Sequence, residues 1–362
     1  MSILKTCHTC LVSAVALALV ASFATTSLAC SRAMYVGPNG TIITARSNDW
    51  TGSQHTNLWL YPRGVSRDGG GAPGAITWVS KYGSVTAAGW DLGTIDGMNE
   101  KGLVANTLYL AESDYGKPAA NDPRKPLSLT AWAQYALDNL ATVGEAVEAF
   151  KSEPFYIVGL KLPDGHEGTA HLSLSDLTGD SAIFEYVGGK LVIHHGAEYK
   201  VMTNSPTFDK QLSLNGYWQS VGGQTFLPGT NRASDRFVRA SYYMDTVIKT
   251  DDTNEALATA MSVIRNVSVP VGITTPGQPN IAATQWRTMS DQKNMVYYFE
   301  SAFAPYLLSV DLKIVNLAEG SPVQKIALTE KSVLMADGKF VSGEVSSYFK
   351  PEQAFKFAGT VE

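Results

Sequence analysis

The stretch "SLACSRAMYVG" spans Ser27–Gly37 and joins a hydrophobic leader to the first predicted strand. In that leader, Lys5 precedes the apolar run "LVSAVALALVASFA" at 11–24. The run has the length of a signal-peptide core and is too short to span a membrane. Cleavage after Ala29 would leave Cys30 as the first residue of the mature chain, and an unpaired thiol in an oxidising compartment calls for a functional explanation.

The end of the leader favours cleavage by a signal peptidase over a membrane anchor or a lipid anchor. Ser27 and Ala29 are the small residues that a signal peptidase requires three and one positions before its cut. A lipoprotein would carry Leu three positions before the cysteine and a small residue two before, whereas Ser27 and Leu28 occupy these places in the reverse order. We therefore expect residues 1–29 to be a removed signal peptide. The alternatives are a membrane anchor and a lipid-anchored binding protein acylated at Cys30.

The composition is that of a packed globular protein. Hydrophobic residues make up 44% of the chain and aromatic residues 10%. Removal of 29 of the 362 residues leaves 27 basic against 33 acidic residues, a net charge of −6. This mild acidity, without a basic run, excludes a nucleic-acid-binding protein as the leading class. Beyond the leader there is no spanning segment, and the length allows one large domain or two small ones.

Strand-like segments dominate the rest of the chain. They are rich in β-branched and aromatic residues, with Gly, Asn or Asp between them. The predicted strands lie at 41–45, 56–62, 75–80, 102–110, 169–176, 181–187, 189–195 and 294–301. The turn sequences "LTGD" at 177–180 and "VGGK" at 187–190 are typical of hairpins, which indicates an antiparallel sheet.

Two pairs of helices are also predicted, because apolar residues recur at spacings of three and four. The predicted helices are 127–141, 142–150, 233–249 and 253–267. Ser234 and Thr253 are candidate N-caps of the second pair. Strands interrupted by two paired-helix insertions indicate an α+β architecture, with helices layered on sheets.

The terminal cysteine predicts a particular chemistry. Cys7 and Cys10 leave with the leader, so Cys30 is the only cysteine of the mature chain and no internal disulfide can form. A cysteine nucleophile needs a base. The α-amine that processing would create has an ordinary pKa of about 7.7 to 8.0, close to about 8.5 for the thiol. One terminal residue could therefore supply both nucleophile and base.

Partners for such a residue follow in the segment "TIITARSNDW" at 41–50. Arg46 would lower the thiol pKa, and Asp49 would hold and orient the ammonium group. A solvated charge pair at a strand end is the alternative for these two residues. The histidines do not lie in a cysteine-protease-like sequence, and we expect surface or strand positions for them: His55, His166, His171, His194 and His195.

Four ordered segments, beginning with "CSRAMYVG…ITARSNDW", resemble the choloylglycine hydrolase family, which includes penicillin V acylases and bile salt hydrolases. The segments lie at 30–50, 96–110, 201–212 and 227–243. The resemblance runs from Cys30 to about Phe299. It implies a four-layer α+β fold of the N-terminal nucleophile hydrolases, with two stacked antiparallel sheets between helical layers. It also implies that residues 30–362 form a single domain.

The resemblance assigns roles to five residues. Cys30 matches the nucleophile, and Arg46 matches the arginine beside the thiol. Asp49 matches the aspartate that binds the α-amine. Asn204, in "VMTNSP", matches the side-chain donor to the oxyanion, for which a turn asparagine is the alternative. Arg236, in "SDRFVRA", matches the arginine that completes the charged cluster.

A backbone N–H after "NEKGL" is the second oxyanion donor that the resemblance implies. We assign it to Tyr109, with Leu108 as the alternative one residue away. Bile salt hydrolases carry asparagine at this place and penicillin V acylases tend to an aromatic residue, so Tyr109 favours the second group. The alternative interpretation of Tyr109 is an aromatic residue that packs against the neighbouring strand. Arg239, one turn after the matched arginine, is expected at the surface.

The predicted activity is hydrolysis of a linear amide by a cysteine-nucleophile acylase, with a small-molecule acyl amide as substrate. Trp50, Tyr109 and Met34 are candidate walls of an apolar cleft, although for Met34 a place in the core is favoured. Such a cleft suits penicillin V or the long acyl chains of N-acyl-homoserine lactones, which would make the protein a quorum-quenching enzyme. A conjugated bile salt hydrolase is the alternative.

The resemblance carries further expectations. Exported relatives in Gram-negative bacteria resemble this sequence better than bile salt hydrolases that lack a leader, so the periplasm is the predicted compartment. Relatives of this kind are often homotetramers, and a homo-oligomer is therefore expected. No cluster of metal-ligating residues is visible in the sequence, and no cofactor and no metal are expected.

Overall fold

A computed structural model describes residues 29–222, 225–273, 282–304 and 306–359. Residues 1–28, which form nearly all of the predicted leader, lie outside the described residues, so the removal of this segment stays a prediction. Within the described ranges, no helix combines the length and apolarity needed to cross a bilayer.

The first sheet is built on the strand that starts at Cys30. Strand β1 (Cys30–Val36) pairs antiparallel with β2 (Ile42–Trp50), and Cys30 lies opposite Asn48. Among the described residues, seven strands form this sheet in the order β16 (Val201–Met202), β1, β2, β17 (Ala283–Asp291), β18 (Val296–Ser301), β19 (Leu307–Asp311) and β23 (Gly343–Glu344). Every residue of β2 is buried, because this strand lies inside the sheet with other layers packed on both faces.

The second sheet contains nine described strands. Their order is β15 (Lys190–His195), β14 (Ser181–Val187), β13 (Ala170–Ser175), β8 (Val104–Tyr109), β7 (Gly93–Asn99), β6 (Ser84–Gly89), β3 (Asn57–Tyr61), β20 (Gln324–Ile326) and β24 (Lys350–Pro351). Both predicted hairpin turns are confirmed, since β14 pairs antiparallel with β13 and with β15. Gly188 and Gly189 adopt φ of 58° and 74° in the second turn, a conformation that a glycine adopts without steric cost.

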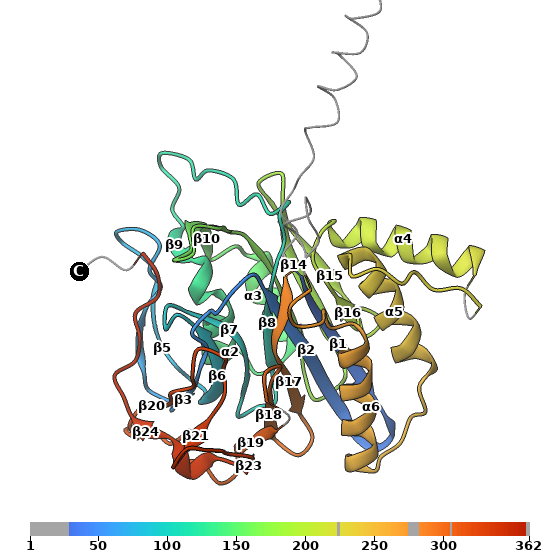
Figure 1. The fold of residues 1–362 in the computed structure, drawn as a ribbon. Helices are drawn as coiled ribbons and strands as arrows, with labels where there is room; N and C mark the ends of the chain where they lie inside the picture. The colour runs from blue at the N-terminus through green and yellow to red at the C-terminus, as the bar shows by residue number, and fades with distance from the viewer. Residues whose placement is uncertain (1–28, 223–224, 274–281, 305, 360–362) are drawn as a thin grey trace, which may run out of the picture.

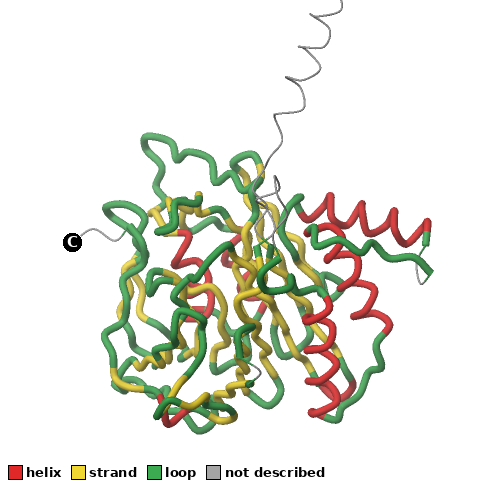
Figure 2. The backbone as a smooth tube through the Cα atoms, in the orientation of Figure 1, coloured by secondary structure: helices red, strands yellow, loops and turns green. Residues whose placement is uncertain are grey.

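Helices cover the outer faces of the two sheets (Figures 1 and 2). Helices α5 (Ala233–Thr246) and α6 (Thr253–Asn266) pack on β1 and β2, whereas α2 (Trp132–Asn139) and α3 (Val143–Lys151) pack on the second sheet. Between the sheets lies an apolar core that includes Leu58, Val85, Met98, Val104, Trp286, Tyr297 and Phe299. The predicted fold class, α+β with two stacked, largely antiparallel sheets between helical layers, is confirmed.

The remaining elements are short or peripheral. They are η1 (Pro38–Gly40), β4 (Ser66–Asp68), β5 (Thr77–Val79), β9 (Lys125–Ser128), η2 (Leu129–Ala131), β10 (Phe155–Val158), β11 (Leu160–Lys161), β12 (Glu167–Gly168), α4 (Phe208–Val221), β21 (Met335–Ala336), β22 (Lys339–Phe340) and η3 (Ser346–Tyr348). Each predicted strand segment overlaps an observed strand, but β2 continues to Trp50, so Arg46 lies inside the strand rather than at its end.

Three predictions about helices need correction. The segment 127–141 is helical only over 132–139, because its beginning pairs as β9 with β10 and then forms η2. The N-caps of α5 and α6 are Arg232 and Asp252 rather than Ser234 and Thr253; the Asp252 carboxylate accepts a hydrogen bond from the Glu255 N–H.

Helix α4 was not predicted at all. Among its side chains, only Phe208 and Gln211 are fully buried, and Leu212, Tyr217 and Val221 are exposed. Its apolar residues therefore do not gather on one face, and the periodic signal by which amphipathic helices are identified is missing.

Candidate active site

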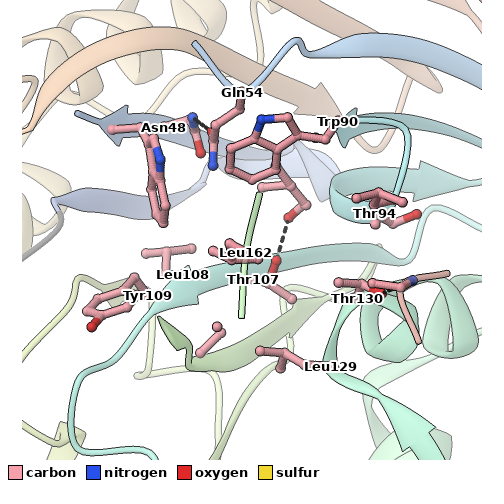
Figure 3. A pocket seen from close by; sticks show the side chains of 18 of the residues that line it. Asn48, Gln54, Trp90, Thr94, Thr107, Leu108, Tyr109, Leu129, Thr130 and Leu162 are labelled. Atoms are coloured by element: carbon pink, nitrogen blue, oxygen red, sulfur yellow. Dashed lines mark hydrogen bonds between the residues drawn. The ribbon is translucent and has the colours of Figure 1, made fainter. Parts of the chain in front are cut away.

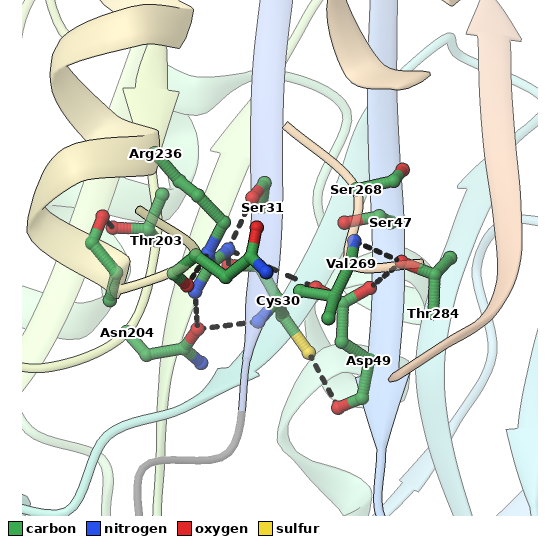
Figure 4. A network of polar contacts seen from close by, with 12 residues as sticks. Cys30, Ser31, Ser47, Asp49, Thr203, Asn204, Arg236, Ser268, Val269 and Thr284 are labelled. Atoms are coloured by element: carbon green, nitrogen blue, oxygen red, sulfur yellow. Dashed lines mark hydrogen bonds and ion pairs between the residues drawn. The ribbon is translucent and has the colours of Figure 1, made fainter. Parts of the chain in front are cut away.

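Cys30 lies at the junction of the two sheets and α5, where the register of β1 and β2 surrounds it with polar groups. Side chains of a strand alternate between its two faces, so Arg46 and Asp49 of β2 point to opposite sides of the first sheet. Arg46 lines a cavity beside Cys30, and Asp49 faces Arg236 of α5. Figure 4 shows Cys30 between Asn204 and Asp49.

The Cys30 thiol is buried, with one cation beside it. The Arg46 Nη2 atom lies 3.6 Å from Cys30 Sγ. Burial raises the pKa of the Cys30 thiol, and the positive charge of Arg46 opposes this shift. Arg46 itself donates hydrogen bonds to Ile95 O at 2.9 Å and Asn48 Oδ1 at 3.0 Å. The guanidinium is thereby fixed against the sulfur rather than free in solvent.

Asp49 has one satisfied and one unsatisfied carboxylate oxygen. Thr284 Oγ1 donates to Asp49 Oδ1 at 2.6 Å. Asp49 Oδ2 is buried without a hydrogen-bond partner among the described residues, and Arg236 Nη1 is 3.9 Å away. Burial raises the pKa of Asp49 to about 6, against the lowering effect of Arg236. The free oxygen is an acceptor for which the part of the chain that the structure describes offers no donor.

Asn204 lies in the loop between β16 and α4 and contacts Cys30 from the other side. Asn204 Oδ1 accepts hydrogen bonds from the backbone N–H of Cys30 and from Arg236 Nη2, the latter at 2.9 Å. Asn204 Nδ2 donates to Tyr109 O at 2.7 Å. The two donors to Oδ1 and the one acceptor of Nδ2 fix the orientation of the Asn204 amide. The second proton of Nδ2 stays available to a ligand.

The geometry of β8 distinguishes between the two candidate backbone donors. Leu110 N–H donates to Thr169 O of the neighbouring segment, and backbone groups alternate sides along an antiparallel strand. The amide of Leu108 therefore faces β13, and that of Tyr109 faces the other side, where the Tyr109 carbonyl meets Asn204. On that side the ladder with β7 ends at the pair Asp96 and Asn106, before Tyr109 is reached. The structure brings the Tyr109 N–H, rather than that of Leu108, to the side of Asn204.

Arg236 ties the terminus of the first strand to α5. Its guanidinium donates to Cys30 O at 2.6 Å, to Ser31 Oγ at 2.5 Å and to Asn204 Oδ1. The expectation that Arg239 lies at the surface is wrong. Arg239 is 9% exposed and donates to the carbonyl oxygens of Pro228 and Thr230, so it fixes the loop that precedes α5.

A cavity opens beside Cys30. Its walls are mainly apolar and include the two predicted residues Trp50 and Tyr109. Further residues that line it were not identified from the sequence: Gln54, Trp90, Leu92, Leu129, Thr130, Leu160 and Leu162 (Figure 3). Trp90 follows β6 in a turn, with φ of 52°. A bulky aromatic residue at a turn was the one sequence signal that could have identified it as a cavity residue.

Met34 does not line this cavity. Its side chain is fully buried, with its sulfur 3.9 Å from Arg32 Nη2. The structure thus places Met34 in the core, the alternative that the sequence favoured, and separates it from Trp50 and Tyr109.

The histidines contribute no base to the thiol. No hydrogen bond between Cys30 and a histidine occurs in the described residues, and His171, the most buried of the five, bonds to Glu185 and Thr203 instead. In the same ranges no group of three or more His, Cys, Asp or Glu side chains is arranged to hold a metal ion.

Comparison with known proteins adds to this geometry. The model of the linear amide C–N hydrolases, choloylglycine hydrolase family, matches residues 30–326. A penicillin V acylase from Pectobacterium atrosepticum is 48% identical, over 97% of this chain and 96% of that protein. A bile salt hydrolase/transferase from Clostridium perfringens is 26% identical, over 61% of this chain and 73% of its own length.

Solved structures agree with these matches. The penicillin V acylase from Agrobacterium tumefaciens has a TM-score of 0.83 and 50% identity, and the match covers 91% of this chain and 100% of that one. A mutant conjugated bile acid hydrolase from Clostridium perfringens has a TM-score of 0.70 at 24% identity, over 83% of this chain and 97% of that one. The second match shows a likeness of fold alone.

Proposed function

Because the chain belongs to the choloylglycine hydrolase family, it is an amidohydrolase of linear amide C–N bonds, and we propose that Cys30 is its nucleophile. The observation that carries this proposal is the position of Cys30. Its thiol lies beside Arg46 at the cavity, and its backbone nitrogen lies beside Asn204. Arg236 links the Cys30 carbonyl to Asp49, whose Oδ2 has no hydrogen-bond partner among the described residues. Removal of residues 1–29 would turn the Cys30 backbone nitrogen into an amine.

The first half-reaction forms a thioester. The α-amine takes the proton of the thiol, and the thiolate attacks the carbonyl carbon of the substrate. The resulting oxyanion accepts hydrogen bonds from Asn204 Nδ2 and the Tyr109 N–H. The α-ammonium then gives its proton to the leaving nitrogen, the C–N bond breaks, and the amine product departs.

The second half-reaction uses the same groups in the reverse direction. The free α-amine removes a proton from water, and the hydroxide attacks the thioester carbonyl. The C–S bond breaks, the carboxylic acid leaves, and the proton returns to the sulfur. Asn204 Oδ1 and Asp49 Oδ2, which has no donor within the described ranges, stabilise the ammonium stage of both steps.

We propose penicillin V and long-chain N-acyl-homoserine lactones as the substrate classes. The aromatic and leucine-rich cavity suits a phenoxyacetyl group or an alkyl chain. The 48% identity to a penicillin V acylase, against 26% to a bile salt hydrolase/transferase, supports this ranking over conjugated bile salts.

A turnover panel tests both the nucleophile and the substrate. Penicillin V, acyl-homoserine lactones of several chain lengths and glycocholate are compared with the wild-type protein and with Cys30→Ser. We expect turnover of the first two classes and little of the third. Faster turnover of glycocholate would reverse the ranking, and full activity of Cys30→Ser would remove the role of the sulfur.

Processing and assembly belong to the same proposal. We propose that residues 30–362 form one domain, that export to the periplasm uncovers Cys30, and that the mature chain is a homotetramer. Intact mass spectrometry is expected to show a chain that begins at Cys30 without added lipid, and light scattering a mass of four chains. A triacylated Cys30 would support the lipid-anchored alternative, because an acylated amine cannot act as a base.

A further inference from the structure

Buried polar side chains that take no part in the proposed chemistry bond to the main chain of the loop that carries Asn204. The loop connects β16 to α4, over residues 203–207. Its backbone contacts His171 of β13 and Gln211 of α4, both of which have no exposed surface. The Asn204 side chain contacts Cys30 and Tyr109, whereas His171 and Gln211 contact the main chain of the loop.

His171 bridges the loop and a buried carboxylate. Its Nε2 lies 2.7 Å from Thr203 O, and since a carbonyl can only accept, this nitrogen carries a proton. Its Nδ1 lies 2.8 Å from Glu185 Oε1. The Glu185 carboxylate also accepts from the N–H of Phe208, at 3.0 Å and 3.2 Å, at the start of α4. The pair of His171 and Glu185 therefore fixes both ends of the loop.

Gln211 holds the middle of the same loop. Its Nε2 donates to Asn204 O and to Pro206 O, the latter at 2.7 Å. Its Oε1 accepts from Thr203 Oγ1 at 2.8 Å. Each of these bonds restrains the main chain on either side of the Asn204 α-carbon, while Arg236 restrains the side-chain oxygen.

We propose that His171 is a positioning residue for the reaction, which holds the Asn204 amide where the oxyanion forms, with Gln211 in a supporting part. This inference rests on the proposed function of Asn204. A displacement of about 1 Å at a catalytic group can cost about 100-fold in rate. The Thr203 carbonyl is one residue from Asn204, so loss of the His171 donor leaves a buried carbonyl unsatisfied and releases the loop at that point.

Two substitutions separate positioning from stability. The amide nitrogen of glutamine extends about as far as histidine Nε2, and that of asparagine about as far as Nδ1. His171→Gln keeps the donor to Thr203 O but loses the contact with Glu185, whereas His171→Asn does the reverse. We expect His171→Asn to lower kcat about 10- to 100-fold with KM nearly unchanged. We expect His171→Gln to keep most of kcat. Because it removes one hydrogen-bond partner of the buried Glu185 carboxylate, its melting temperature should be lower.

A matched control lies on the same strand. Ser173 is fully buried, and its hydroxyl makes no hydrogen bond within the described residues. Ser173→Ala is expected to leave kcat unchanged. Thr203→Val keeps the side-chain shape and removes the contacts of the Thr203 hydroxyl with Gln211 Oε1 and with Ala233 O. It provides a second test should His171→Asn fail to fold, and a several-fold fall in kcat is expected.

The double variant with Asn204→Ala completes the experiment. If His171 acts through Asn204, His171→Asn costs no further kcat once the Asn204 amide is gone. Equal losses in both backgrounds, or rates that follow melting temperature across the His171 variants, overturn the positioning role. If Asn204→Ala alone leaves kcat unchanged, the proposed function of Asn204 fails instead, so the two failures are distinguishable.

Discussion

The two sides of Cys30 are built in different ways. The thiol side comes from β2, the next strand along the chain, and its cation Arg46 is 16 residues away from Cys30. The amine side is closed by Asn204 and Arg236, which are 174 and 206 residues away. Strand β2 supplies the cation next to the sulfur and also Asp49. The distant segments supply Asn204 Oδ1, which accepts from the Cys30 N–H, and Arg236, which donates to the Cys30 carbonyl.

This difference shows how the proposed nucleophile and base are kept apart although they belong to one residue. Arg46 favours a thiolate, whereas Asp49 and Asn204 present oxygen atoms that favour an ammonium group. Opposite charges are thus stabilised on opposite sides of the same α-carbon. The predictions below change one side at a time.

Removal of the sulfur eliminates the thiol side altogether and has the largest expected effect. Cys30→Ala should lower kcat/KM for penicillin V at least about 10⁴-fold, because no other cysteine follows Cys30 in the sequence. The melting temperature should change little, since alanine fits the same buried site. Activity within tenfold of the wild type would place the nucleophile elsewhere.

Asn204→Ala removes the amide on the distant side. Loss of one oxyanion donor typically costs about 100- to 1000-fold in kcat, and we expect a loss in this range for turnover of penicillin V. Circular dichroism should show an unchanged fold. A change confined to KM would mean that Asn204 binds substrate without stabilising the oxyanion.

Arg46→Met tests the charge on the thiol side, with the side-chain stem preserved over Trp286. Since Arg46 opposes the effect of burial, its removal raises the pKa of the Cys30 thiol further. We expect kcat/KM at pH 7 to fall about 10-fold and the rising limb of the pH profile to move to higher pH. A profile that keeps its position would show that Arg46 does not tune the thiol.

The last prediction concerns stability rather than activity, through Asp49 in the unprocessed chain. Its folded-state pKa of about 6 lies above the ordinary 3.8, so the folded state binds the proton more tightly than the unfolded state. Stability contributed by this proton is present below pH 4 and is lost as the pH rises through 6, by at most about 3 kcal/mol.

Urea unfolding at pH 4.5 and pH 7 measures this dependence. It should be clear in a chain that retains Ala29 and smaller in the mature chain, where the α-ammonium gives Asp49 a counter-charge. Asp49→Asn is the control and should remove the difference between the two chains. The same pH dependence in the two chains and in the Asp49→Asn variant of each would contradict a contact between Asp49 and the terminal amine.

Much of the fold could be predicted because its signals are local. Each predicted strand overlaps an observed one, since β-branched and aromatic residues between turn residues report on a few positions at a time. Helix α4 lacked such a signal, because only Phe208 and Gln211 of its side chains are fully buried. Trp90 escaped prediction because its place in the cavity wall depends on segments far along the chain, among them residues 160–163. The burial of Arg239 escaped prediction because it depends on how the irregular loop before α5 folds onto the helix.

The sequence alone determined which chemical groups are present. They are a cysteine directly after a predicted cleavage site, an arginine and an aspartate in the next strand, and four family segments in order. Tertiary structure alone decided that Asn204 and Arg236 meet Cys30, that Trp90 and Leu162 reach the cavity wall, and that Tyr109 rather than Leu108 turns its amide toward Asn204. The physical reason is that residue type and strand alternation are local properties, whereas register, burial and the approach of distant segments depend on how whole layers pack.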